Sequence, residues 1–310
     1  MRRAALAGLG ALLGCLVFAG CCHQKTPERS IARGAPPAYA EVATRFNERV
    51  GPLDRLWART VVRASYRDKD GRRQRDQFEG HLQYLRPDRL LLTFDKVGNT
   101  YAALGANQRQ YWWLQREPER KAFLGDHDRA DPRKVAELGL PVHPLSFVDL
   151  LAITPLDPGA PGARVEWSAD GRFLLATAPG RLNPRRLWLN PDDYTTTRVE
   201  LLGTGGEVAI TADLSRYQPI AVRGPAADPG WRPTVATALE ATRQSDDLSI
   251  RMDLFEPEVS DRRPLARIFN FETVRGSLRI PEGAVVDLNN GAPGAAAPGA
   301  GDPAPRALAP

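Results

Sequence analysis

The stretch Leu56-Trp57-Ala58-Arg59-Thr60-Val61-Val62-Arg63-Ala64-Ser65-Tyr66-Arg67 decides the fold class. Its even-numbered positions carry apolar or small side chains, whereas three of its odd-numbered positions are arginines. Successive side chains of a β-strand point to opposite faces, so an alternation of this kind is typical of a strand. The stretch therefore predicts a strand with one buried face and one mostly exposed face.

Similar short segments follow along most of the chain, and turn signals such as Asp68-Lys69-Asp70-Gly71 and Val97-Gly98-Asn99 separate them. This regular spacing favours an antiparallel sheet that is curled or closed, and thus a mainly β fold. The further strands that we expect are Gln77–Leu85, Arg89–Asp95, Tyr101–Leu104, Gln108–Gln115, Ala163–Ser168, Arg172–Ala178, Arg186–Asn190, Thr195–Leu202, Glu207–Leu214, Thr234–Ala241, Leu248–Phe255 and Phe269–Thr273.

Three segments have helical patterns instead. In Ala38–Val50 apolar residues recur every three or four positions, with prolines before the segment and Gly51-Pro52 after it. Asp131-Pro132 opens a short predicted helix that ends at Leu138. The segment Leu145–Ile153 is apolar around most of its circumference, so we expect a helix that is buried on nearly every side and plugs the sheet.

The N-terminus has the order of a secretory signal: Arg2 and Arg3, an apolar run, and then Phe18-Ala19-Gly20-Cys21. Small residues before a cysteine resemble a bacterial lipobox, so we expect residues 1–20 to be removed and Cys21 to carry lipid. A plain signal peptide and an uncleaved anchor are the alternatives. Because Cys22 is not aspartate, we expect an envelope protein anchored to the outer membrane and facing the periplasm.

The remaining domain boundaries follow from composition. Residues 21–37 are polar and contain several prolines, which predicts a lipidated tether, and residues 291–310 are mostly Gly, Ala and Pro, which predicts a disordered tail. Residues 38–290 then form one β domain. All three cysteines precede this domain, so it has no disulfide framework, thiolate metal site or catalytic thiol.

Charge and motifs exclude several functions. The net charge of +5 comes from scattered arginines rather than a concentrated basic face, so we expect no nucleic-acid partner. The triplet Asp126-His127-Asp128 could bind a metal, although a solvated loop explains it equally simply. The sequence lacks a Gly-x-Ser-x-Gly elbow, a phosphate loop and a His-Glu-x-x-His motif. We therefore expect no enzyme activity, no metal and no cofactor.

Two segments of the sequence resemble those of a known family. Tyr84-Leu85-Arg86-Pro87-Asp88-Arg89-Leu90 and Gly139-Leu140-Pro141-Val142-His143-Pro144-Leu145-Ser146-Phe147 resemble segments of the LolA/LolB-like lipoprotein carriers and receptors. The resemblance implies an incompletely closed antiparallel barrel of roughly eleven strands. It also implies helices that plug the mouth and an apolar cavity that binds acyl chains of lipids or lipoproteins. Receptor members expose a leucine on an early loop, and Val97 is the nearest position here for such a membrane contact.

Residue patterns supply candidate ligand contacts. We expect one face of the sheet to line the cavity, and Phe147 and Leu151 of the plug to face it together because they are four residues apart. Trp112 and Trp113 are adjacent in a strand, so one should line the interior and the other should lie outside. The candidate set is Val62, Leu90, Leu92, Phe94, Trp112, Trp113, Phe147 and Leu151.

Three functions remain open at this point. The first is a carrier or receptor for lipids or lipoproteins, and the second is a passive envelope scaffold or assembly partner without a ligand. The third is a hydrolase, which a buried histidine beside a serine or an aspartate would favour. An apolar cavity would favour the carrier, whereas a filled interior with a long exposed sheet edge would favour the scaffold.

Overall fold

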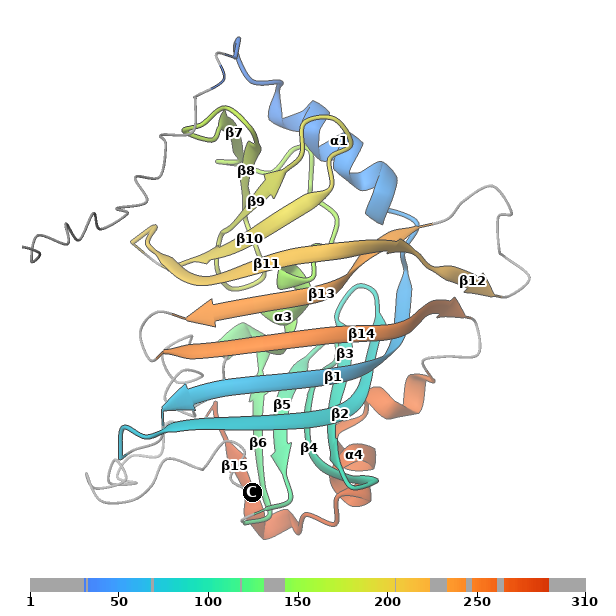
Figure 1. Cartoon of the computed structure of the whole chain (residues 1–310). Coiled ribbons are helices and arrows are strands. Elements are labelled where there is room, and N and C mark those ends of the chain that lie inside the picture. Colours follow the sequence, from blue (N-terminus) through green and yellow to red (C-terminus); the bar gives the residue numbers. More distant parts are fainter. Residues whose placement is uncertain are drawn as a thin grey trace, which may run out of the picture.

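The computed structural model contains one strongly curved sheet. The structure describes residues 31, 33–67, 70–117, 119–130, 143–203, 205–223, 233–243, 247–260 and 265–289. In Figure 1 its long strands cross in front of the helix α3. The helix expected at Asp131–Leu138, the signal peptide, Cys21 and the C-terminal tail lie outside the described residues.

The described residues contain fifteen strands, three α-helices and three short 3-10 turns. The α-helices are α1 (Tyr39–Val50), α3 (Pro144–Leu150) and α4 (Phe271–Ser277), and the 3-10 turns are η1 (His127–Arg129), η3 (Ala266–Phe269) and η4 (Glu282–Ala284). The strands are β1 (Arg55–Arg67), β2 (Arg73–Leu85), β3 (Arg89–Lys96), β4 (Asn99–Ala106), β5 (Gln110–Gln115), β6 (Lys121–Asp126), β7 (Arg164–Trp167), β8 (Leu174–Ala178), β9 (Arg185–Leu189), β10 (Thr196–Leu202), β11 (Val208–Pro219), β12 (Ala221–Arg223), β13 (Thr234–Arg243), β14 (Leu248–Ser260) and β15 (Val285–Asp287).

The sheet is curled but not closed. Its order is β15-β6-β5-β4-β3-β2-β1-β14-β13-β11-β10-β9-β8-β7, with β12 beside β14. All neighbours are antiparallel except the pairs β15–β6 and β12–β14. Because the edge strands β7 and β15 do not pair with each other, the described sheet forms an incompletely closed barrel, as the family resemblance implies. It has more strands than expected because β6, β12 and β15 were not predicted, and two of them, β12 and β15, have only three residues each.

The alternation in β1 is confirmed. Its even-numbered residues from Leu56 to Ala64 are all buried, whereas the three arginines on the other face are exposed. The strand pairs with β2 on one side and with β14 on the other, so one buried face continues across the sheet. The helix α1 covers this face near the start of β1 and buries Val42, Ala43, Phe46 and Val50, the stripe that its periodicity predicts.

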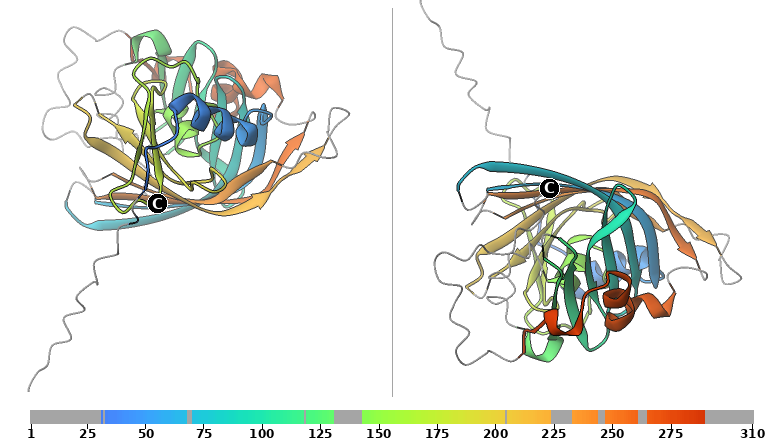
Figure 2. Two further views of the ribbon diagram at one scale, coloured as in Figure 1. Left: turned by 90° about the horizontal axis from the view of Figure 1, so that it is seen from above. Right: turned by 90° about the horizontal axis from the view of Figure 1, so that it is seen from below.

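The expected strand Phe269–Thr273 is wrong, because this segment is the end of η3 followed by α4. Asn270 begins the helix by accepting a hydrogen bond from Thr273 N to its side chain at 3.0 Å. Buried residues at Phe271, Val274 and Leu278 then recur at helical spacing. They pack on the outward face of β3–β6 and form a second core there. Figure 2 shows α1 and α4 at different places around the curled sheet.

The end of the expected tether contacts the domain. Ile31 N donates to Asp170 O at 2.8 Å, and Trp167 Nε1 donates to Gly34 O at 2.9 Å. The Arg33 guanidinium lies 5.0 Å from the centre of the Trp167 ring. Ile31, Arg33 and Gly34 therefore contact the β7–β8 hairpin. None of the helices in the described part of the chain is long and apolar enough to cross a membrane.

Candidate ligand-binding site

The concave face of the sheet, α1 and α3 share one large apolar core. Seven of the eight expected ligand contacts belong to it and are buried, because alternate residues of the strands point inward. These seven are Val62, Leu90, Leu92, Phe94, Trp113, Phe147 and Leu151. The structure thus brings together residues from β1, β3, β5 and the plug that are up to 89 positions apart in the sequence (151 − 62).

Trp112 lies on the opposite face of β5 from Trp113. It belongs to the second core, where its ring centre is 6.0 Å from that of Phe271 in α4. Trp113 is therefore the tryptophan that lines the interior. Trp112 is fully buried rather than exposed, because α4 covers the outward face that we expected to be in solvent.

Aromatic rings form one part of the concave core. The ring centres of Phe94 and Trp113 are 5.6 Å apart, and those of Phe94 and Phe78 are 6.0 Å apart at a right angle. Tyr101 lies 6.0 Å from Phe78. Burial raises the pKa of the Tyr101 hydroxyl, and the charges of Glu117 and Asp76 act in the same direction. This part of the concave core therefore consists mainly of packed aromatic rings.

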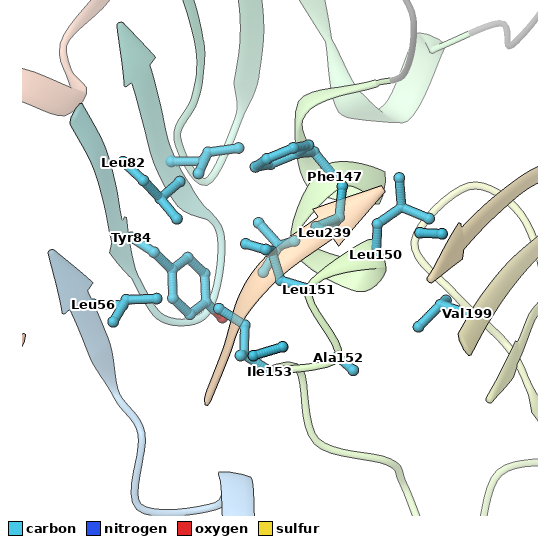
Figure 3. Packing of buried hydrophobic residues seen from close by; sticks show 14 of the residues in the cluster. Leu56, Leu82, Tyr84, Phe147, Leu150, Leu151, Ala152, Ile153, Val199 and Leu239 are labelled. Atoms are coloured by element: carbon cyan, nitrogen blue, oxygen red, sulfur yellow. The ribbon is translucent and has the colours of Figure 1, made fainter. Parts of the chain in front are cut away.

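The helix α3 occupies the centre of the concave space, and all seven of its residues are buried, as expected for a plug. Figure 3 shows Phe147 and Leu151 on the side that faces Leu82 and Tyr84 of β2, whereas Leu150 points toward Val199 of β10. One short helix therefore joins the two halves of the sheet through apolar contacts. A ligand on the concave face would have to share this space with α3 or displace it.

Two polar side chains fix the chain that follows α3. Asn47 of α1 donates to Leu156 O at 2.7 Å and accepts from Leu156 N at 2.8 Å. The Arg86 guanidinium donates to Val50 O and Gly51 O at the end of α1, at 2.9 and 2.6 Å, and to Ile153 O at 3.4 Å. Arg86 therefore connects the β2–β3 turn to α1 and to the end of the plug through hydrogen bonds.

A buried ion pair fixes α3 itself. Asp149 Oδ1 lies 2.7 Å from Arg185 Nη1 of β9, and the two side chains are only 4% and 3% exposed. Arg185 Nη2 also donates to Thr154 O and Pro155 O, at 3.3 and 3.0 Å. Sequence reasoning missed this pair, although an aspartate in an otherwise apolar helix was a signal, since a buried carboxylate needs a partner.

His143 precedes α3 and is buried. Its Nδ1 accepts from Leu145 N at 3.2 Å, and its ring packs on Tyr111 and His127, with centres 4.4 and 5.5 Å away. Burial lowers the pKa of His143 to about 3, and the nearby His127 lowers it further. A general base needs a pKa near the working pH, and no described contact joins this ring to a serine or an aspartate.

His127 contacts neighbouring groups rather than a metal cluster. Its Nε2 lies 2.7 Å from Asn107 O, and its ring stacks on Tyr111. Within the described ranges, no three His, Cys, Asp or Glu side chains come together as metal ligands would. The triplet Asp126-His127-Asp128 thus contributes the ring contact of His127 to the domain.

Val97 lies at the tip of the β3–β4 hairpin and is 95% exposed, more than any other large apolar side chain described. Its φ of 51° falls in the left-handed region, which β-branched residues rarely adopt. The turn with Gly98, whose φ is 76°, forces this conformation and points the side chain away from the domain. The structure thus presents an isolated apolar group three residues after Phe94 of the concave core.

Comparisons with known proteins rest on structure, since no protein-family model and no curated protein matches the sequence. A crystal structure of a putative outer membrane lipoprotein-sorting protein domain from Vibrio parahaemolyticus matches with a TM-score of 0.52 and 11% identity, over 76% of this chain and 97% of that one. A DUF1329 family protein from Desulfovibrio piger matches with a TM-score of 0.49 and 12% identity, over 76% of this chain and 97% of that one. A LolA superfamily protein from Nitrosomonas europaea matches with a TM-score of 0.47 and 14% identity, over 76% of this chain and 99% of that one.

The first of these matches supports a conclusion about the fold, because it extends over nearly all of the Vibrio domain. Its low identity limits that conclusion to the fold. The open antiparallel sheet and the central plug agree with the architecture that the family resemblance implies. The chain therefore has a LolA/LolB-like fold.

Proposed function

We propose that the protein is a lipid-anchored envelope protein that holds an acyl chain between α3 and the concave face of the sheet. The observation that supports this proposal is the apolar composition of the concave core, whose centre is filled by one seven-residue helix that a ligand would have to displace. The similar domain from Vibrio parahaemolyticus is named for lipoprotein sorting, and we extend that role, without catalysis, to this chain.

The energetics support such a ligand. Each acyl methylene that leaves water contributes about 0.8 kcal/mol, so ten methylenes would contribute roughly 8 kcal/mol before ordering costs. The contacts of α3 with Leu82, Tyr84 and Val199 would have to be exchanged for contacts with the chain. A carrier would require this exchange to be reversible, so the two sets of contacts would have to be of similar free energy.

The anchor and the membrane contact are part of the same proposal. Cys21 would carry the lipid that holds the protein on the outer membrane, and Val97 would touch the bilayer surface. Metabolic labelling with a fatty acid tests the anchor: we expect Cys21→Ala to lose the label and Cys22→Ala to keep it. Label on the Cys21→Ala protein would contradict the assignment.

Photo-cross-linking tests the acyl site. The full-length protein in nanodiscs is irradiated with a fatty acid that carries a diazirine in its chain, and the modified peptides are identified by mass spectrometry. We expect adducts on β3, β5 and α3. Leu92→Arg places a charge in the apolar core and should abolish them, whereas Gln83→Arg, which puts the same charge on the outward face of β2, should not.

The alternative is a passive envelope scaffold, which the filled interior of the described domain favours. It predicts that adducts appear only at exposed positions and that an excess of unlabelled fatty acid does not reduce them. This result, with both arginine variants still folded by circular dichroism, would overturn the carrier and favour the scaffold.

A further inference from the structure

The fold brings arginines that are scattered along the sequence onto the outward face of the long strands β1, β2 and β14. Arg63 of β1 lies directly opposite Arg251 of β14, and Arg67 of β1 lies directly opposite Arg73 of β2. Arg75 follows on the same face of β2, and all five residues are exposed. We call these five residues the arginine face. Figure 1 shows it turned toward the viewer, with no helix of the described residues in front of it.

The arginine face does not stabilise the fold, because like charges on directly opposite residues destabilise a sheet. One carboxylate offsets part of the repulsion. Asp253 Oδ2 lies 2.6 Å from Arg63 Nη1 and 3.8 Å from Arg251 Nε, and Arg216 of β11 also pairs with Asp253. Arg216 has a φ of 56°, in the left-handed region that residues other than glycine rarely adopt. Three guanidinium groups therefore share one carboxylate.

The other acids nearby leave an excess of positive charge. Arg67 pairs with Asp247 at 2.6 Å, and Glu79 of β2 and Glu240 of β13 border the arginine face. With Arg216 included, six arginines stand against four acids, which gives this part of the sheet a net charge of +2 (6 − 4).

The outward charges of β9 and β10 are paired one to one instead. Arg186 Nη1 lies 3.2 Å from Glu200 Oε2, and Arg198 Nε lies 2.7 Å from Asp213 Oδ1. The excess of positive charge is therefore a property of the sheet around β1, β2 and β14, and it is suited to an anionic partner.

The proposed anchor would keep the domain close to one anionic partner, the membrane. Cys21 and Ile31 are ten positions apart (31 − 21), and Ile31 N is hydrogen-bonded to Asp170 O of the domain. Ten extended residues span at most about 35 Å, so a lipid on Cys21 would hold this side of the domain within that distance of the bilayer. At the resulting high effective concentration, a modest electrostatic attraction is sufficient to orient the domain. A soluble acidic protein has no such restraint.

We propose that the arginine face is a membrane-docking surface, which lies against the phosphate groups of anionic lipids when the domain is anchored. Guanidinium groups bind phosphate oxygens through two parallel hydrogen bonds, and each arginine near an anionic lipid surface strengthens the attraction. The inference rests on the lipid anchor of the proposed function but not on its acyl site.

Arginine footprinting tests this surface. The lipidated, full-length protein is bound to nanodiscs of phosphatidylcholine alone or of phosphatidylcholine with phosphatidylglycerol, and its arginines are modified with phenylglyoxal. Mass spectrometry then gives the modification rate of each arginine. Arg45 is the internal control, because it is exposed on α1, away from the outward face of the sheet.

We expect the anionic lipid to slow modification of the arginine face at least about fivefold, and to leave Arg45 unchanged. Salt at about 1 M should abolish this protection, because it screens charges beyond about 3 Å. Arg75→Gln removes one charge and no described hydrogen bond or ion pair, so it should reduce the protection of Arg251 about fivefold. The matched variant Arg45→Gln should keep the protection.

Three results would overturn the inference. The first is equal modification of the arginine face on both kinds of nanodisc, which leaves the anchor intact but excludes docking. The second is protection by soluble poly-glutamate without protection by the anionic lipid, which would assign the face to an acidic protein. The third is a protein that binds neither nanodisc, in which case the anchor fails as well. Binding to the anionic nanodisc alone would instead support the face and contradict the anchor.

Discussion

Asn47 of α1 and Leu156 exchange two hydrogen bonds, of 2.7 and 2.8 Å, across 109 positions of the sequence. The amide side chain acts as both donor and acceptor for one backbone residue, as a neighbouring strand would. It therefore fixes the segment after the plug to the N-terminal helix at one defined place. The loop Ile153–Leu156 is thus the fixed end of α3, about which the helix would turn if it moves.

Asn47→Ala should loosen this end of the plug. The substitution leaves Leu156 N and O without their partner, which costs about 1–3 kcal/mol in the free energy of unfolding. Hydrogen exchange at the Leu156 amide should become faster in the folded state, as mass spectrometry can measure. Glu48→Ala is the control, because Glu48 is exposed and forms only a surface pair with Arg45. Equal exchange in both variants would show that other contacts hold the loop.

The buried His143 should make the protein less stable in mild acid. Its pKa is about 3 in the folded state, below the ordinary value of 6.5 that applies after unfolding. The unfolded chain therefore binds a proton first, so the contribution is fully present above about pH 6.5 and is lost as the pH falls. Between about pH 7.5 and about pH 5 the free energy of unfolding should decrease by about 2 kcal/mol from this residue.

Urea denaturation at the two pH values measures this effect. His143→Asn should remove most of the decrease, because Asn can still accept from Leu145 N but does not titrate. His81→Asn, at a half-exposed position, should retain it. A decrease of the same size in His143→Asn as in the wild type would assign the acid sensitivity to other groups.

The adjacent tryptophans should affect different properties. Truncation of either buried indole to alanine should cost about 3–5 kcal/mol in the free energy of unfolding. Trp113→Ala should in addition reduce cross-linking of the acyl probe, because Trp113 lines the concave core. Trp112→Ala should instead expose α4 to limited proteolysis, because Trp112 packs on Phe271. Identical cleavage patterns and identical probe yields in the two variants would contradict the separation of the cores.

Val97 should contribute to membrane contact at the expense of stability. Val97→Gly removes the strain of a β-branched residue at positive φ and should raise the free energy of unfolding by about 1 kcal/mol. It should also weaken flotation of the unlipidated, full-length Cys21→Ala protein with vesicles. Val97→Leu keeps an apolar side chain and should float like the parent. Unchanged flotation of Val97→Gly would exclude the hairpin tip as a membrane contact.

Local patterns in the sequence were sufficient to predict the sheet and the first helix. The alternation in β1 and the stripe in α1 each reflect burial on one face, which is a property of consecutive residues. The plug was predictable for the same reason, since a segment apolar around its circumference has to be buried. These predictions needed no knowledge of distant partners, and they supplied seven residues of the concave core.

The errors came from contacts between distant segments. Phe271, Val274 and Leu278 have helical spacing, but the expected strand ended at Thr273, before the second and third of them. For the same reason, the sequence did not predict that the outward-facing Trp112 is buried. Nothing in β5 shows that a helix beginning 159 positions later covers it (271 − 112). Arg185 was likewise assigned no partner, since its ion pair with Asp149 joins two segments that the sequence does not connect.

The second core beneath α4 has a mechanical consequence. Strands β3–β6 carry apolar clusters on both faces, whereas the described part of β7–β10 contributes to the concave core alone. One wall of the molecule should therefore be stiff and the other compliant, with hydrogen exchange slowest in β4 and β5. If the concave space widens to admit cargo, the wall that yields is the one formed by β7–β10, the side that Ile31 and Gly34 contact.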